Sequence, residues 1–238
     1  AIPGSTALPI GWSQGYTRWD NSQQQAITSG FAVLEAAAGD VLQLHSFRTD
    51  NNGTATQARA ADGTALQLVK LDEVHMSYAR LSLGSDAAGP TGIGDANFVT
   101  VPYDTTDELD AAFTYDGSGG LTLVDGGKYL VTANTYLFQS GERTSLVQRL
   151  TLDGTLGPGS LTEGYLRGTP NSCTDGAASL GMIIEATAGQ VLRVQGRLDV
   201  GRTPTTYVGG RCALSVVKID DAADYVRLIN TTNVNVNT

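Results

Sequence analysis

Apolar and polar residues alternate with a period of two along much of this chain. This pattern is typical of β-strands that bury one face and expose the other. It is clearest in residues 41–47, 121–124, 129–137, 146–150 and 191–195. These segments therefore predict half-buried strands.

Dipeptides that favour tight turns separate these segments. Asp-Gly and Asn-Gly suit turn positions that require a positive φ. They recur often enough to predict short strands at intervals of roughly 8–15 residues, as in an antiparallel sandwich. The dipeptides are Asn52-Gly53, Asp62-Gly63, Asp116-Gly117, Asp125-Gly126, Asp153-Gly154, Asp175-Gly176 and Gly209-Gly210.

Two stretches have a composition that also suits helices. Residues 23–38 are rich in Ala and Gln, but they align with residues 177–188, where Leu180 and Ile184 stand in a strand-like run. Strand is therefore the prediction for both of these segments. The short acidic run at 108–113 is predicted to be a loop or a single turn.

The order of landmarks along the chain repeats once. Gly15 and Gly164 are 149 residues apart, Gly39 and Gly189 150, Lys70 and Lys218 148, and Tyr78 and Tyr225 147. A repeat of this length is the size of a whole domain and not of a solenoid unit. The sequence therefore predicts tandem copies of one domain type. We expect a partial copy, the back half of the repeat, at 1–74 and a complete copy at 75–220. Residues 221–238 are expected to start a further copy, or to form a strand-donating or disordered tail.

The complete copy resembles a known jelly-roll superfamily, that of tumour necrosis factor and the globular head of complement subcomponent one-q. The residues that carry the resemblance are Ala112-Phe113, the run 121–133 with Gly127-Lys128-Tyr129, the segment 180–194 with Gly189-Gln190-Val191, and the closing strand 212–219. In the partial copy Ala38-Gly39-Asp40-Val41 is similar to the same family turn. Leu130, Val131 and Ala133 depart from the family head, where aromatic residues often stand.

The resemblance implies a ten-stranded all-β fold, here as tandem antiparallel jelly-roll sandwiches. It also implies association as a compact homotrimer. Modules of this kind act as recognition heads, as ligands or as structural units, and jelly rolls also build viral capsid, decoration and fibre proteins.

Charge excludes some classes of partner. The net charge is −9 and no basic cluster stands at either end, so direct nucleic-acid binding is not expected, because it needs Lys or Arg against phosphate. No run of 18 apolar residues is present, so no membrane span is expected. Two cysteines, Cys173 and Cys212, are compatible with a disulfide or with two separate thiols.

The residues that could carry catalysis are few. His45 and His75 are the only histidines, and neither lies in a recognisable nucleophile–base arrangement or zinc-binding spacing. Both are interpreted as ordinary polar residues. Asp104, Asp107, Glu108 and Asp110 could supply calcium ligands, but the run lacks the glycine and terminal glutamate of a calcium loop. A solvated acidic loop is the favoured interpretation, and no catalytic, cofactor or metal residue is assigned.

Aromatic and glycosylation patterns leave recognition open. Trp12, Tyr16 and Trp19 could stack on a sugar or be buried, and the segments starting at Asn52 and Asn230 match the N-glycosylation pattern. The first hypothesis is a non-enzymatic structural protein that forms a multimeric assembly with neighbouring subunits, most concretely a virion component. The alternative is a secreted module that binds a glycan or a receptor. Both place the protein outside cells or on a virion surface, and a glycoside-cleaving enzyme is the least favoured class.

Overall fold

The computed structural model describes residues 36–41, 77–84, 97–140, 144–157, 160–166, 175–198, 205–208 and 210–219. Regular structure in these ranges is entirely β, with no helix. The strands are β1 (Tyr78–Ser82), β2 (Val99–Thr100), β3 (Thr105–Leu109), β4 (Phe113–Tyr115), β5 (Gly120–Leu123), β6 (Gly127–Ser140), β7 (Thr144–Leu152), β8 (Thr155–Leu156), β9 (Thr162–Leu166), β10 (Asp175–Ala186), β11 (Val191–Leu198), β12 (Thr205–Val208) and β13 (Ala213–Ile219).

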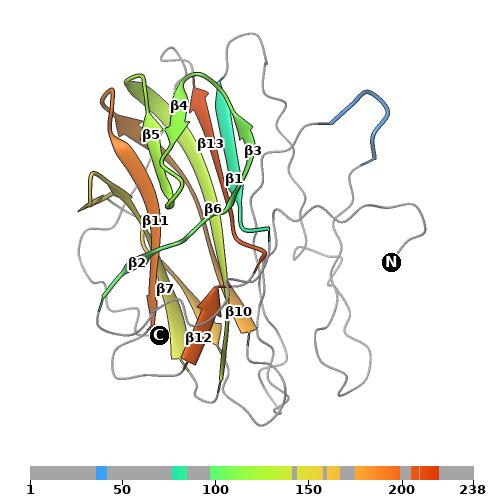
Figure 1. The fold of residues 1–238 in the computed structure, drawn as a ribbon, viewed down its shortest axis with the longest axis vertical. Coiled ribbons are helices and arrows are strands. Elements are labelled where there is room, and N and C mark those ends of the chain that lie inside the picture. Colours follow the sequence, from blue (N-terminus) through green and yellow to red (C-terminus); the bar gives the residue numbers. More distant parts are fainter. Residues whose placement is uncertain are drawn as a thin grey trace, which may run out of the picture.

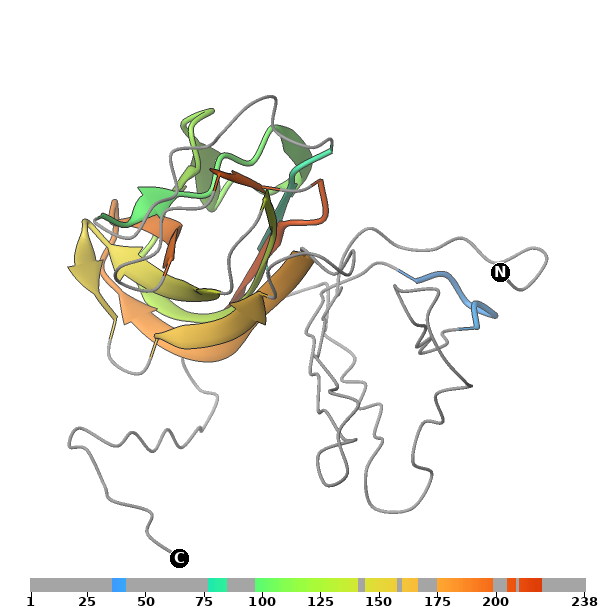
Figure 2. The ribbon, with the colours of Figure 1, turned by 90° about the horizontal axis from the view of Figure 1, so that it is seen from below.

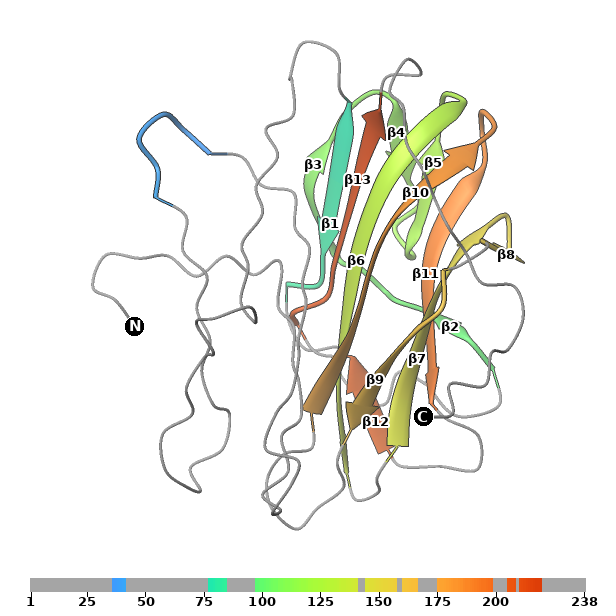
Figure 3. The same cartoon turned by 180° about the vertical axis from the view of Figure 1, so that it is seen from behind.

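The strands form two antiparallel sheets that face each other (Figures 1 and 2). In the first, here called the β6 sheet, the order is β10-β6-β13-β1-β3, and β12 also pairs with β6. In the second, the β11 sheet, the order is β4-β5-β11-β7-β8, with β2 on β11 and β9 on β7. Figure 3 shows the sandwich from behind, where β9 and β10 bring the two sheets together at one side.

The connections between strands define a jelly roll. From β5 onward the chain crosses repeatedly between the sheets: β5 lies in the β11 sheet, β6 in the β6 sheet, β7 in the β11 sheet, β10 in the β6 sheet and β11 in the β11 sheet. Crossing connections between two antiparallel sheets distinguish this fold from a meander, in which consecutive strands pair directly. The predicted all-β jelly-roll fold is therefore confirmed, whereas its tandem arrangement stays a prediction.

The core lies between the sheets and follows the period-two pattern. In β11 the inward residues Leu192, Val194 and Leu198 are fully buried, and the alternating residues face outward. Tyr129 and Val131 of β6 meet them from the opposite sheet. Each predicted strand in the complete copy therefore corresponds to an observed one: 121–124 to β5, 129–137 to β6, 146–150 to β7, 177–188 to β10 and 191–195 to β11. Within 41–47 and 23–38, only Val41 and residues 36–38 are described.

Two local predictions need correction. The acidic run is not all loop, because Glu108 and Leu109 end strand β3 and only residues 111–112 form a turn. Pairing with β1 extends β3 through these two residues, since Arg80 lies opposite Glu108. Asp175-Gly176 does not form a turn but begins β10, because it continues the ladder opposite β6.

One turn occurs in both predicted copies. In the complete copy the Gln190 amide donates to the Thr187 carbonyl (3.3 Å), and the Thr187 amide donates to Gln190 Oε1 (2.9 Å). In the partial copy the Asp40 amide donates to the Ala37 carbonyl (3.1 Å), and the Ala37 amide donates to Asp40 Oδ2 (2.8 Å). The glycines between them have φ values of +83° at Gly189 and +96° at Gly39. The two segments therefore share one turn geometry as well as similar sequences.

Candidate recognition site on the β11 sheet

Arginine side chains gather on the outward face of the β11 sheet. Because inward positions of β11 are filled by Leu192, Val194 and Leu198, the alternating Arg193, Gln195 and Arg197 must point away from the core. Strand β7 lies beside β11 with Arg149 opposite Gln195. A chain with fifteen basic and twenty-four acidic residues thus places three arginines on two adjacent strands.

Phe98 packs among these arginines. It directly precedes β2, which pairs with β11 through Thr100 opposite Gln195. The guanidinium carbon of Arg149 lies 3.8 Å from the centroid of the Phe98 ring, and that of Arg197 lies 5.1 Å from it. A cation over an aromatic face is attracted by the ring quadrupole, so the ring holds both guanidinium groups in place. We call Phe98, Arg149, Gln195 and Arg197 the arginine platform.

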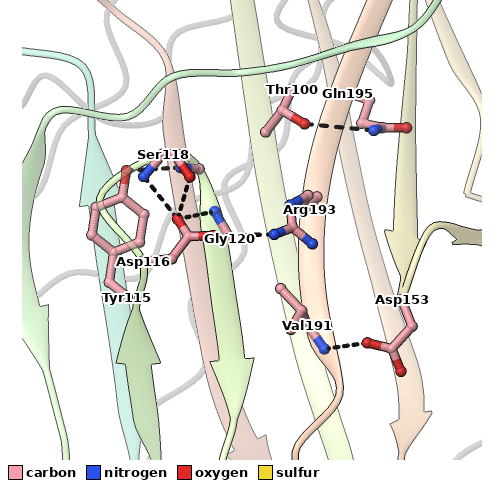
Figure 4. Close-up of polar contacts among 10 residues, drawn as sticks. Thr100, Tyr115, Asp116, Ser118, Gly120, Asp153, Val191, Arg193 and Gln195 are labelled. Atoms are coloured by element: carbon pink, nitrogen blue, oxygen red, sulfur yellow. Dashed lines mark hydrogen bonds and ion pairs between the residues drawn. The ribbon is translucent and has the colours of Figure 1, made fainter.

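Hydrogen bonds fix the platform further. Arg149 Nε donates to Gln195 Oε1 at 2.8 Å, and Gln195 Nε2 lies 3.5 Å from Thr100 Oγ1. Figure 4 shows the contact between Gln195 and Thr100, and Arg193 beside it on the same strand. The orientation of Arg149 is thus determined by one ring and one amide, which leaves its terminal N–H groups outside these contacts.

The electrostatics of the platform favour an anion. Burial lowers the pKa of Arg149, and the positive charge of Arg197 lowers it further. Among the residues that the structure describes, no carboxylate forms an ion pair with Arg149. Two like charges beside one ring repel each other, and an anion placed between them would relieve this repulsion.

Arg193 differs from Arg149 because a described carboxylate forms an ion pair with it. Its Nη2 lies 3.1 Å from Asp116 Oδ2. The other oxygen of Asp116 accepts hydrogen bonds from the Ser118 amide (2.7 Å), the Ser118 hydroxyl (2.9 Å) and the Gly120 amide (2.9 Å). Figure 4 shows this arrangement at the β4–β5 turn. Burial alone would raise the pKa of Asp116, but the Gly120 and Ser118 hydrogen bonds and the Arg193 charge together lower it.

This geometry suits binding more than bond breaking. A guanidinium is planar and presents paired N–H donors that match the two oxygens of a carboxylate, sulfate or phosphate group. Within the described ranges, no group of three or more His, Cys, Asp or Glu residues could hold a metal ion. The platform can therefore orient an anionic group through charge-assisted hydrogen bonds.

The acidic residues named from the sequence do not gather into one site. Asp104 Oδ1 accepts a hydrogen bond from the Gly84 amide (2.7 Å), Asp107 lies 3.5 Å from Arg80, and Asp110 Oδ2 accepts from the Tyr78 amide (2.8 Å). Each carboxylate holds a different part of β1 or of the residues after it. The interpretation of the run as a solvated loop is therefore wrong for Asp107, which lies in β3, whereas Asp104 is exposed and lies outside the strands. These contacts give a calcium site no support.

The remaining sequence candidates divide into two groups. Cys212 is buried, and its Sγ accepts a hydrogen bond from the Tyr136 amide at 3.1 Å. Cys173, its partner in the disulfide alternative, lies outside the described residues. No helix in the described part of the chain is long and apolar enough to cross a membrane. The following lie outside the described residues: Trp12, Tyr16, Trp19, His45, His75, Cys173 and the two segments that match the glycosylation pattern, at 52–54 and 230–232.

The sequence pattern did not predict the arginine platform. A signal was present, since Arg149 and Gln195 stand at outward positions of strands that the pattern predicts. The pattern does not contain the register that places Arg149 opposite Gln195, or the pairing of β2 with β11 that brings Phe98 against Arg149 and Arg197.

Comparison with known proteins gives a likeness of fold. Neither a protein-family model nor a curated protein matches the chain. Among solved structures, murine APRIL at pH 8.0 matches with 11% identity and a TM-score of 0.42, over 60% of this chain and 99% of that one. Eiger TNF from S. frugiperda matches with 16% identity and a TM-score of 0.41, over 65% of this chain and 99% of that one. Both are jelly rolls of the tumour necrosis factor family. The assignment of the jelly roll itself rests on the strand order of the two sheets.

Proposed function

We propose that this protein is a non-enzymatic recognition module that acts outside cells and binds an anionic group of a glycan or receptor at the arginine platform. The observation that carries the proposal is the placement of Arg149 beside Arg197. Arg149 is stacked on Phe98 at 3.8 Å and has no ion-pair partner among the described carboxylates. An arginine that is already oriented loses little conformational entropy when it binds a carboxylate or a sulfate.

Binding of the full chain to immobilised oligosaccharides tests this proposal. Sulfated and carboxylated sugars should bind, neutral sugars of the same length should not, and the affinity should fall as salt is raised. Arg149→Gln removes the charge but keeps an amide donor. We expect this substitution to weaken binding by about tenfold to a hundredfold, since a charge-assisted hydrogen bond contributes about 1.5–3 kcal/mol.

Arg211→Gln is the matched control. Arg211 also lies over an aromatic ring, at 5.2 Å from the centroid of Tyr136, but on the β6 sheet. Its loss should leave affinity unchanged. Equal binding by the wild-type chain and Arg149→Gln, or no preference for anionic over neutral sugars, would overturn the proposal. An acidic peptide array run in parallel separates a protein receptor from a glycan.

The virion role predicted from the sequence remains a prediction. No contact among the described residues favours a virion component over a recognition module, and nothing in them bears on neighbouring structural subunits. The absence of enzymatic activity and the homotrimer also remain predictions.

A further inference from the structure

Strand β1 occupies a well-defined place between two neighbours in the β6 sheet. Tyr78 lies opposite Val217 and Leu81 opposite Leu214 of β13, while β3 pairs with the other edge of β1. Ala79 and Leu81 point into the core and are 1% and 0% exposed. The place thus requires apolar side chains at the second and fourth positions of the strand.

The third position has a charge requirement. The pairing of β1 with β3 shifts register between Arg80 and Leu81, so that Asp107 bulges out of the ladder. The carboxylate of Asp107 lies 3.5 Å from Arg80 Nε, and both side chains are mostly buried, with 21% and 23% exposed. An arginine at this position therefore compensates a carboxylate that would otherwise lie half-buried without a partner.

The chain contains a second segment that meets these requirements. Tyr225-Val226-Arg227-Leu228 repeats the order aromatic, apolar, arginine, leucine of Tyr78-Ala79-Arg80-Leu81. It also follows a repeated context, since Lys218-Ile219-Asp220 precedes it as Lys70-Leu71-Asp72 precedes Tyr78. The same strand is therefore encoded twice, and the described sheet uses the first copy.

We propose that the place of β1 beside β13 is a strand-exchange site, which accepts residues 225–229 from another copy of this chain. Exchange of an equivalent element between protomers costs little, because the incoming strand packs and pairs in the same way as the strand that it replaces. Val226 is larger than Ala79 at a position with almost no exposure, so β1 fits its own place better than residues 225–229 do. Because exchange also requires two chains to meet, the exchanged species should increase with protein concentration.

Insertion of residues 225–229 into the sheet of their own chain is the less favourable arrangement. In the register of β1, Tyr225 would lie opposite Val217, and because β13 ends at Ile219, residues 220–224 would form the hairpin loop. A loop of five residues is within the usual length of hairpin loops. It would, however, bring Asp220, Asp221 and Asp224 together in one tight turn, where their like charges repel each other.

A disulfide between two differently tagged chains tests the proposal. One chain carries Ala213→Cys and the other Ile229→Cys, both with Cys173→Ser, because the fifth position of β1, Ser82, lies opposite Ala213. Ala213 is 4% exposed, so a thiol there reacts only with a strand that lies directly beside it. We expect a disulfide that joins positions 213 and 229 of different chains, with a yield that rises with concentration.

Two controls make the result decisive. Asn235→Cys places the donor thiol in the tail beyond the repeated strand and should cross-link at background level. Adding Leu228→Asp to the Ile229→Cys chain should remove the cross-link, because it puts a charge at the inward fourth position while leaving the described strands unaltered. A yield between chains no higher than that of the Asn235→Cys control would overturn the proposal. So would a disulfide that forms only when both thiols are in one chain. Arg149→Gln should not affect the yield, so this test is separate from that of the proposed function.

Discussion

At the scale of single residues, Asp116 shows how one carboxylate can organise a turn. It accepts three hydrogen bonds from its own turn and pairs with Arg193 on the neighbouring strand. Asp116 was recognised in the sequence only as part of a turn dipeptide. Its link to Arg193, 77 residues away, depends on the pairing of β5 with β11, which no local pattern contains.

The pKa of Asp116 predicts a pH-dependent contribution to stability. The folded state lowers this pKa below the ordinary 3.8, so the contribution is fully present above that value and is lost as pH falls through the folded pKa. Asp116→Asn should lower the free energy of unfolding at pH 6 by about 1 kcal/mol, since the group is partly exposed. The difference from wild type should shrink below about pH 4.

Urea unfolding between pH 2.5 and pH 7 measures this effect. Asp125→Asn is the control, because Asp125 pairs with Lys218 through a side chain that is 56% exposed and should contribute almost nothing. A difference between wild type and Asp116→Asn that stays constant across the whole pH range would contradict the prediction.

At the scale of elements, turn chemistry was predictable wherever the turn is local. Asp153-Gly154 joins β7 to β8 as a two-residue hairpin, and both residues have positive φ, 49° and 78°. This is the backbone that Asp-Gly favours between paired strands. Asp175-Gly176 has the same two residue types but lies in a strand, because its pairing with Phe138 and Leu137 overrides the local preference for a turn. Glu108 lies in a strand for the same reason, because it pairs with Arg80.

A glycine repeated in both predicted copies has a structural role in the complete one. Gly164 of β9 lies where the two sheets meet, and a Cβ atom there would overlap the carbonyl of Ala177 in β10. Gly164→Ala should therefore force β9 and β10 apart and lower the free energy of unfolding by about 3 kcal/mol. Gly157→Ala is the matched control, since a Cβ there meets its neighbours only at ordinary van der Waals distances of 3.5–3.7 Å. Thermal and urea unfolding compare the two variants, and equal stabilities would show that the sheets can separate freely at this point.

At the scale of the whole molecule, the sequence predicted the sandwich but not the arginine platform. Fold class follows from period-two alternation, which each strand carries in its own residues. The platform instead depends on three segments, around Phe98, Arg149 and Gln195, that only the strand order brings together. Global topology therefore determines the candidate site, whereas local pattern determines the elements.

The mass of the native assembly distinguishes the two kinds of association inferred for this chain. A homotrimer is a ring of head-to-tail contacts that closes after three copies, so its mass should plateau at three times 24.8 kDa as concentration rises. Strand exchange adds a second head-to-tail contact on other surfaces, so it links trimers into larger species at high concentration unless it also closes into a ring. Light scattering of the wild type should therefore show a plateau at the trimer mass followed by a further rise, and Leu228→Asp should keep the plateau and lose the rise. A monomer at micromolar concentration would contradict the trimer. A late rise that Leu228→Asp leaves unchanged would show that another surface causes it.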